Sequence, residues 1–370
     1  MKAFEPKCSL RRIHRRAAMK ANIHNKILAD EERVMKPSVL MLGLALCIGA
    51  TSAVLAADEP IVIKFSHVVA ADTPKGKAAD FFAQRAAELT GDKVKVEVYP
   101  NSALYKDKEE LEALQIGAVQ MLAPSLAKFG PLGVKDFEAF DLPYIFTDYD
   151  DLHAVTQGEI GQSILKKLEP KGIVGLAFWD NGFKSFSANF PIKTPEDMKG
   201  KKFRIQSSKV LEEQMRALKA LPQVMAFSEV YQALDTGVVD GTENPPSNMF
   251  TQKMHEVQTD LTLTEHGYLG YAVIVNKKFW AGLPEDVRGQ LEQAMKESTE
   301  LANRIAKEEN DQALAGIEAS GKTKVYTPTA EEKLAFKLKL VPVHDKMASR
   351  VGKELIESIY QATGFKPDSL

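Results

Sequence analysis

From residue 61 onward, segments with a two-residue hydrophobic repeat alternate with segments that have a helical repeat. Ile61–Ser66 is apolar and β-branched, and valines alternate with charged residues over Val94–Val98, so both segments are predicted strands. Apolar residues recur at helical spacing over Gly76–Leu89 between them. A helix over Asp107–Leu114 and a buried strand over Val119–Leu122 are expected to follow. This order of elements predicts an α/β sheet.

The second half of the chain continues the alternation. Further strands are predicted at Ile173–Phe178, Phe183–Ala188, Lys202–Gln206 and Gly270–Asn276. Asn181-Gly182 predicts a turn between the first two of these strands. Ser207 or Ser208 is the candidate N-cap of one helix, and Ser228 is the candidate N-cap of the next. From Pro284 to about residue 319 the pattern is helical, and a helix of about 30 residues would reach ~45 Å, further than one lobe.

A faint internal repeat suggests two similarly built lobes. Residues 112–120 resemble residues 232–240, at an offset of 120 residues, and both read as a helix, a glycine stop and a buried strand. Coincidence between two ordinary units is the alternative. Ligands of open α/β sheets bind beyond the carboxyl ends of the strands. The segments just after the matched strands, Pro124-Ser125 and Thr242–Asn244, are therefore expected to meet across a cleft.

The N-terminus predicts export to the periplasm. The apolar run Val39–Ala50 is too short for a stable membrane span, and Val54–Ala56 fits a signal-peptidase site, so cleavage is expected after Ala56 or Ala57. A retained membrane anchor is the alternative. The basic stretch over residues 1–34 suggests a start codon assigned too early, or an unusually long charged region. Residues 1–56 are therefore set apart from the fold as a signal peptide with an N-terminal extension.

Composition and motifs favour binding over catalysis. The formal net charge is −2, with acids and bases mixed along the chain, which gives no reason to expect a nucleic-acid partner. Cys8 and Cys47 both precede the expected cleavage point, so the exported chain would have no thiol for catalysis, metal binding or a disulfide. Sequence motifs of common hydrolases, nucleotide-binding loops and metal sites are absent from the sequence. Neither an enzyme nor a cofactor is predicted.

Three polar residues are candidates for binding a carboxylate. Arg204 lies in a predicted strand between apolar neighbours, where it either occupies an exposed face or points into a cleft as a bidentate clamp. Lys184 follows the predicted turn at a strand start. Asn244 follows a buried strand in a rigid Pro-containing turn, where it could bind a carboxylate or close an Asx-turn.

Several long motifs resemble the extracytoplasmic solute-binding proteins of TRAP transporters. They are Val224–Leu234, Val239–Pro245 and Thr194–Arg204, and the resemblance covers about Ile61–Tyr360. Within that family the chain most resembles the DctP type, which binds four-carbon dicarboxylates. The segments that suggest this are Phe65–Ala70, Thr73–Lys77, Leu122–Gly130 and Trp179–Lys184.

The resemblance implies a two-lobe periplasmic binding protein fold of the α/β class, with a long helix spanning both lobes and a ligand cleft between them. Lobe I would comprise residues 57–181 and about 270–309, and lobe II residues 182–269 and about 310–345. Residues 346–370 would form a C-terminal tail helix. The implied protein is a monomer that delivers its ligand to membrane-embedded permease subunits.

The resemblance also implies roles for residues of lobe II. Arg204 would be the main salt-bridge partner of a ligand carboxylate, and Asn244 would hydrogen-bond the same group. Phe227 would form a wall of the pocket. Lys184 stands where sialate-binding members carry a second arginine, and a lysine neutralises charge without a bidentate grip.

A dicarboxylate also needs a partner for its far end. Lobe I offers His67, Lys75 and Ser125, of which His67 and Lys75 are expected to hold the distal carboxylate. Asn248 and His266 are further candidates near the cleft. The favoured ligands are malate, succinate and fumarate, and the alternatives are another organic acid such as a 2-oxo acid or sugar acid, a periplasmic α/β enzyme, or a sensor's ligand-presenting partner.

Overall fold

The computed structural model describes residues 59–367, so the predicted signal peptide lies outside the described residues. The predicted strand–helix alternation of the first segment is confirmed. Its elements are β1 (Ile61–Ser66), α2 (Pro74–Thr90), β2 (Val94–Tyr99), α3 (Glu110–Gln115) and β3 (Met121–Leu122). β1 lies between β2 and β3 and is parallel to both. β3 has only two residues, fewer than the predicted strand.

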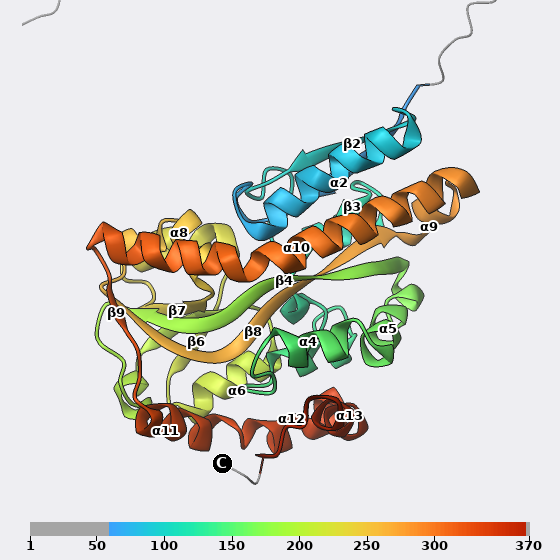
Figure 1. Cartoon of the computed structure of the whole chain (residues 1–370). Coiled ribbons are helices and arrows are strands. Elements are labelled where there is room, and N and C mark those ends of the chain that lie inside the picture. The colour runs from blue at the N-terminus through green and yellow to red at the C-terminus, as the bar shows by residue number, and fades with distance from the viewer. Residues whose placement is uncertain (1–58, 368–370) are drawn as a thin grey trace, which may run out of the picture. The chain divides into compact units, whose positions relative to one another are not determined.

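All the strands of the described residues belong to one mixed sheet in the order β2-β1-β3-β8-β4-β7-β5-β6, with β9 paired to β8. The remaining strands are β4 (Ile173–Ala188), β5 (Lys202–Ile205), β6 (Leu221–Val224), β7 (Gly241–Asn244), β8 (Asp260–Asn276) and β9 (Lys324–Tyr326). β4 and β8 are antiparallel, and these two long strands run together through the middle of the sheet (Figure 1). They join the part of the sheet around β1 to the part around β5 and β7.

Helices cover the sheet on both sides (Figure 1). They are α4 (Tyr149–Thr156), α5 (Glu159–Lys166), α6 (Lys209–Ala217), α7 (Val230–Asp235), α8 (Pro246–Thr251), α9 (Lys277–Ala281), α10 (Glu285–Ser320), α11 (Ala330–Leu340), α12 (Val343–Val351) and α13 (Lys353–Thr363). α10 has 36 residues, so it is about 54 Å long. It packs against α2, β4 and α8 in turn, which confirms the predicted long helix.

The predicted turn at Asn181-Gly182 is wrong, because β4 continues through these residues with a bulge between Asp180 and Gly182. Asn181 is fully buried, and its side chain bonds to neighbouring elements instead of closing a turn. A Cβ on Gly182 would lie 2.7 Å from Nδ2 of Asn310 in α10. The glycine therefore allows close packing of β4 against α10, which tertiary contacts impose and local sequence does not reveal.

The internal repeat is visible in the structure. α3 and α7 each precede a glycine with positive φ, 79° at Gly117 and 70° at Gly237. A strand then follows, β3 or β7. The expected turn after residue 240 is itself the strand β7, and the predicted cap Ser228 lies inside a 3₁₀ turn while Glu229 occupies the N-cap position of α7. Of the two candidates Ser207 and Ser208, Ser208 caps α6.

The C-terminal helices are part of the folded body. Val343, Met347, Ile356 and Ile359 belong to the apolar cluster that contains residues of α4, α5 and the segment before them. α11 packs on a separate cluster, with β4, β5 and α6. No helix within residues 59–367 is both long and apolar enough to cross a bilayer.

Candidate functional site

A small cavity lies near the carboxyl ends of β1, β3, β5 and β7. Its volume is about 20 Å³, room for roughly one water molecule. It is lined by Val68, Val69, Lys75, Asp107, Ser125, Lys128, Arg204, Gln206, Phe227, Asn244, Asn248, Leu269 and Tyr271. Six of the nine residues predicted to bind a ligand are in this set: Lys75, Ser125, Arg204, Phe227, Asn244 and Asn248. As expected from the repeat, segments after β3 and at the end of β7 meet here.

Arg204 reaches the cavity because of its position in β5. It is directly opposite Thr242 in the neighbouring strand β7, so its side chain lies on the same face as Thr242 and Asn244. Its Nε and Nη2 donate to the carbonyl oxygen of Met225 at 3.1 and 2.9 Å. The guanidinium carbon lies 5.7 Å from the centre of the Phe227 ring. Burial lowers the pKa of Arg204 to about 10, so the side chain is still charged at neutral pH.

Lys75 faces the cavity from the first turn of α2. Its Nζ donates to the carbonyl oxygen of Ala123 at 2.9 Å and lies 3.8 Å from the centre of the Tyr271 ring. The ammonium therefore rests on a π-face and a carbonyl, both of which favour a cation. Burial nevertheless lowers the pKa of Lys75 to about 7, and the negative charge of Glu110 opposes this only in part.

Lys128 is a third buried cation at the cavity that the sequence interpretation missed. It ends the 3₁₀ turn Leu126–Lys128 and pairs with Asp107 and, at 3.0 Å, with Oε1 of Glu110. Its pKa is well below the usual range, first because of burial and then because of the charges of Lys75 and Arg204. The sequence did contain a signal, since Lys128 is the only charged residue in the apolar run 122–130.

The convergence of Lys75, Lys128 and Arg204 decides what the cavity can do chemically. All three are at most 5% exposed, so water screens their mutual repulsion poorly. An anion placed among them would relieve this repulsion and receive charge-assisted hydrogen bonds. The arrangement therefore favours binding of an anion with more than one negative charge.

Lys184 and His266 lie on the other face of the sheet from Arg204. Phe186 of β4 is directly opposite Glu243 of β7, so both side chains share the face that Asn244 does not use. Nζ of Lys184 lies 2.9 Å from Oε1 of Glu243, and Nε2 of His266 lies 2.9 Å from Oε2. Neither residue lines the cavity.

Glu243, which pairs with Lys184 and His266, also acts electrostatically on Arg204 in the cavity. Burial alone would raise the pKa of Glu243, but Lys184 and His266 lower it to about 2, so the carboxylate is charged. Its negative charge raises the pKa of Arg204 and partly offsets the effect of burial. Lys184 and His266 therefore support Arg204 through Glu243 in this structure, and direct contact of either with a ligand stays a prediction.

His67 is buried just behind the cavity wall. Its side chain is 1% exposed, and neither ring nitrogen has a hydrogen-bond partner among the described residues. Burial, and then the charge of Lys75, lower its pKa to about 3, so the imidazole is neutral. It does not line the cavity, and its contact with a distal carboxylate stays a prediction.

Asn248 and Tyr271 are held in place by a buried amide. Nδ2 of Asn181 donates to Oδ1 of Asn248 at 2.9 Å and to the hydroxyl oxygen of Tyr271 at 2.6 Å. Oδ1 of Asn181 accepts from Ser247 Oγ at 2.8 Å. The β4 bulge therefore positions the aromatic ring against which Lys75 lies.

Two contacts close the cavity between walls that are distant in sequence. Ser125 hydrogen-bonds Gln206, and the backbone N–H of Phe227 donates to Asp107. Lys106 and Glu229 form an exposed ion pair of 3.0 Å beside them.

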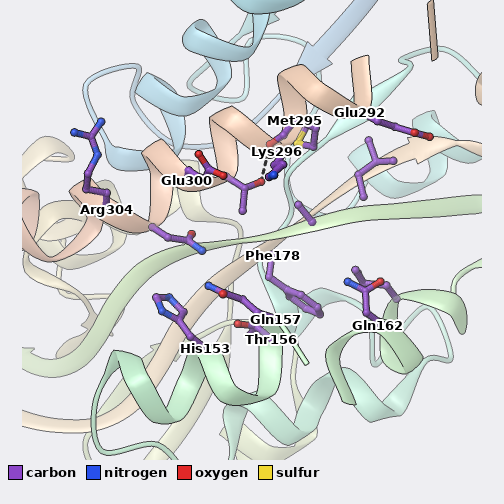
Figure 2. A pocket seen from close by; sticks show the side chains of 15 residues that line it. His153, Thr156, Gln157, Gln162, Phe178, Glu292, Met295, Lys296, Glu300 and Arg304 are labelled. Atoms are coloured by element: carbon purple, nitrogen blue, oxygen red, sulfur yellow. Dashed lines mark hydrogen bonds between the residues drawn. The ribbon is translucent and has the colours of Figure 1, made fainter. Parts of the chain in front are cut away.

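A larger cavity of about 760 Å³ lies between α10 on one side and α4 and α5 on the other, along β4 (Figure 2). His153 and Gln157 approach it from the α4 side, while Lys296 and Glu300 approach from α10 (Figure 2). Its charged residues are of both signs, and it contains none of the predicted ligand residues. Size alone therefore does not identify the carboxylate site.

The side chains around the small cavity are of kinds that recognise a ligand by charge and hydrogen bonds. Within residues 59–367, no group of three or more His, Cys, Asp or Glu side chains could hold a metal ion. The cavity is lined by cations, amides, aromatic rings and one carboxylate, which suit recognition of an anion.

Comparison with known proteins places these features in context. The family model described as bacterial extracellular solute-binding protein, family 7 (DctP) matches residues 65–350. A C4-dicarboxylate-binding periplasmic protein of Rhodobacter capsulatus is 67% identical over 325 residues, covering 86% of this chain and 98% of that protein.

Solved structures agree with this match. A TRAP periplasmic solute-binding protein of Sulfurospirillum deleyianum with bound succinate has a TM-score of 0.80 and 48% identity, covering 82% of this chain and 99% of that one. A counterpart from Pseudomonas aeruginosa with bound L-malate has a TM-score of 0.76 and 42% identity, covering 78% and 100%.

Proposed function

The chain belongs to family 7 of the bacterial extracellular solute-binding proteins, and from this premise we propose that it serves a TRAP transporter. It captures a four-carbon dicarboxylate, such as malate, succinate or fumarate, and delivers it to membrane-embedded permease subunits. The relatives and structural neighbours described above, named for C4-dicarboxylates or solved with succinate or malate, support this assignment.

The observation that carries the proposal is the cluster of three buried cations. Arg204 lies on one wall of the cavity, and Lys75 and Lys128 lie on the other. A ligand with a carboxylate at each end can pair with both walls, whereas a monocarboxylate leaves at least one buried cation uncompensated. Asn244 and Asn248 supply amide groups for the remaining hydrogen bonds.

Binding is coupled to closure of two lobes in this proposal. Lobe I comprises residues 57–181 and about 270–309, and lobe II residues 182–269 and about 310–345. β4, β8 and α10 pass between them and act as the hinge and scaffold. Since each wall of the cavity belongs to a different lobe, a ligand that contacts both walls stabilises the closed state.

Thermal shift of the exported protein tests the ligand class. A ligand that binds only the folded state raises the melting temperature. Malate, succinate and fumarate are expected to raise it, while acetate and butyrate at equal concentration are not. Stabilisation by a sugar acid or a 2-oxo acid, with no response to any dicarboxylate, would contradict the proposed ligand.

Export places this activity in the periplasm. Residues 1–56 act as a signal peptide with an N-terminal extension, and the exported protein is a monomer. N-terminal sequencing of protein recovered from the periplasm should find a start at Ala57 or Asp58, and a retained residue 1–56 segment would contradict this.

A further inference from the structure

Asp107 is the single acidic residue among the charged residues that line the small cavity, the other three being Lys75, Lys128 and Arg204. It precedes α3, and its side chain is 14% exposed. The carboxylate is therefore largely withdrawn from water at a place where the ligand's own carboxylates would bind.

Asp107 contacts both walls of the cavity at once. One oxygen, Oδ1, pairs with the ammonium of Lys128 on its own wall. The other, Oδ2, accepts the backbone N–H of Phe227, whose ring packs against Arg204 on the opposite wall. A single carboxylate thus bridges the two walls and neutralises one of the three cations.

The formal charge of the lining follows from this arrangement. Three cations and one carboxylate leave the lining with a net charge of two positive. A ligand with two negative charges compensates that charge, whereas a singly charged ligand leaves an excess that is costly to bury. Without the Asp107 charge the lining would favour a further negative charge on the ligand.

We propose that Asp107 is a specificity-determining residue, which limits the cavity to two net positive charges and thereby matches it to doubly charged acids while latching it shut on Phe227. This inference rests on the proposed function, because it explains how the same site selects its ligand by the number of negative charges.

Glu110 is a second acid near Lys128, but it is not part of the cavity lining. It lies behind Lys128, 3.0 Å from the ammonium, and does not line the cavity. Its Oε2 is buried without a hydrogen-bond partner, and burial raises its pKa to about 8, although the charge of Lys75 opposes this. Asp107 is therefore the acid that a ligand in the cavity would meet, and Glu110 lies outside the lining.

The test compares Asp107→Asn with wild type by titration calorimetry at about pH 6. An asparagine keeps the size of the side chain and an oxygen that accepts from Phe227, but it removes the charge. The ligands are succinamate, succinate and sulfosuccinate, which share a four-carbon chain and carry one, two and three acidic groups. The affinity gained from succinamate to succinate, and again from succinate to sulfosuccinate, should be larger in the variant than in wild type. At each step the excess should be about tenfold or more.

Glu229→Gln is the matched control. It removes a half-exposed carboxylate two residues from Phe227 that does not line the cavity. The control should keep the wild-type affinity ratios. Equal ratios in Asp107→Asn, the control and wild type would overturn the inference.

A variant of opposite sign covers the case in which Asp107→Asn does not fold. Lys128→Gln lowers the charge of the lining by one, so the preference for succinate over succinamate should fall by about tenfold. An unchanged preference in Lys128→Gln would overturn the charge-matching inference. Failure of wild type to bind any dicarboxylate would instead contradict the proposed function itself.

Discussion

At the scale of single residues, the cavity is defined by side chains that are costly to bury without a partner. The strand position of Arg204 left an exposed face and a cleft both open, and only the family resemblance implied a ligand role. Alternation along β5 and β7 explains why Arg204 shares a face with Asn244. The same alternation explains why Lys184, which was predicted to bind the ligand, pairs with Glu243 on the other face of the sheet. Its partner Glu243 is adjacent to Asn244, but the pairing of β4 with β7 places Glu243 on the opposite face.

Lys128 shows a second limit of the sequence. A lysine in an apolar run is unusual, but only the fold brings it to Lys75 and Arg204. The contact of Asp107 with Phe227 joins residues 120 positions apart, so no local pattern predicts it.

Replacing Arg204 by alanine should weaken succinate binding by roughly 100-fold or more, because it removes one charged partner of a buried pair and leaves the other uncompensated. Arg204→Lys keeps the charge but loses the planar fork, so an intermediate loss is expected. Calorimetric titration of folded variants measures both. Wild-type affinity in Arg204→Ala would show that this residue does not bind the ligand.

Affinity for a dicarboxylate should fall as pH rises above about 7. The pKa of Lys75 is lowered to about 7 by burial, so the ammonium that binds the ligand is lost above that pH. Glu110, with a pKa raised to about 8 by burial, gains a negative charge in the same range and acts in the same direction. The imidazole of His67, with a pKa of about 3, remains neutral throughout.

In the protein without ligand, Lys75 has the opposite effect on stability: it makes stability rise with pH. The unfolded chain holds the Lys75 proton up to its ordinary pKa of 10.5, while the folded chain releases it near 7, so Lys75 makes the free energy of unfolding rise with pH in this interval. Glu110, which keeps its proton in the folded chain up to about pH 8, opposes this rise below that pH. Ligand affinity and the free energy of unfolding, measured for wild type and Lys75→Met between about pH 7 and 10.5, test both statements. The variant should lose the part of each pH dependence that comes from Lys75. A wild-type affinity independent of pH would contradict the role given to Lys75.

At the scale of elements, β4 is where local sequence and tertiary structure disagree most. Asn-Gly is a strong turn signal, yet the amide of Asn181 is fully buried and hydrogen-bonded to Asn248, Tyr271 and Ser247. These partners come from other elements, so the sequence of β4 alone could not outweigh the turn signal. α10, by contrast, was predicted because the helical pattern is continuous from Pro284 to about residue 319, and the structure has 36 residues in this helix.

Gly182→Ala should destabilise the fold by about 1–3 kcal/mol, because the added Cβ would lie 2.7 Å from Asn310 and 3.3 Å from Pro245. Gly289→Ala is the matched control within α10, since a Cβ there meets no atom within 4 Å. The control should stabilise the helix by about 0.5–1 kcal/mol. Chemical denaturation measures both, and equal stability of the two variants would argue against close packing at the bulge.

At the scale of the whole molecule, binding is expected to draw two walls together. The contacts of Asp107 with Phe227 and of Ser125 with Gln206 join segments that only the complete fold makes neighbours. The repeat of α3–β3 in α7–β7 allowed the sequence to predict that these walls face each other. The sequence could not predict how closely they approach.

Spin labels at Lys106→Cys and Glu229→Cys would report this closure. The native side chains lie 3.0 Å apart and are half-exposed, and residues 57–370 contain no cysteine that would compete for the label. Succinate should narrow the distribution of label distances and shift it to shorter values. Identical distributions with and without succinate would contradict coupling between binding and closure.

The central claim is that one cavity binds both carboxylates of a four-carbon acid with cations from two walls. The most direct test compares the affinities of succinate and succinamate for wild-type protein, since the two ligands have nearly the same shape and differ by one charge. Succinate should bind roughly 100-fold or more tightly than succinamate, because the amide leaves a buried cation uncompensated. Binding of the two with affinities within about threefold of each other would contradict it.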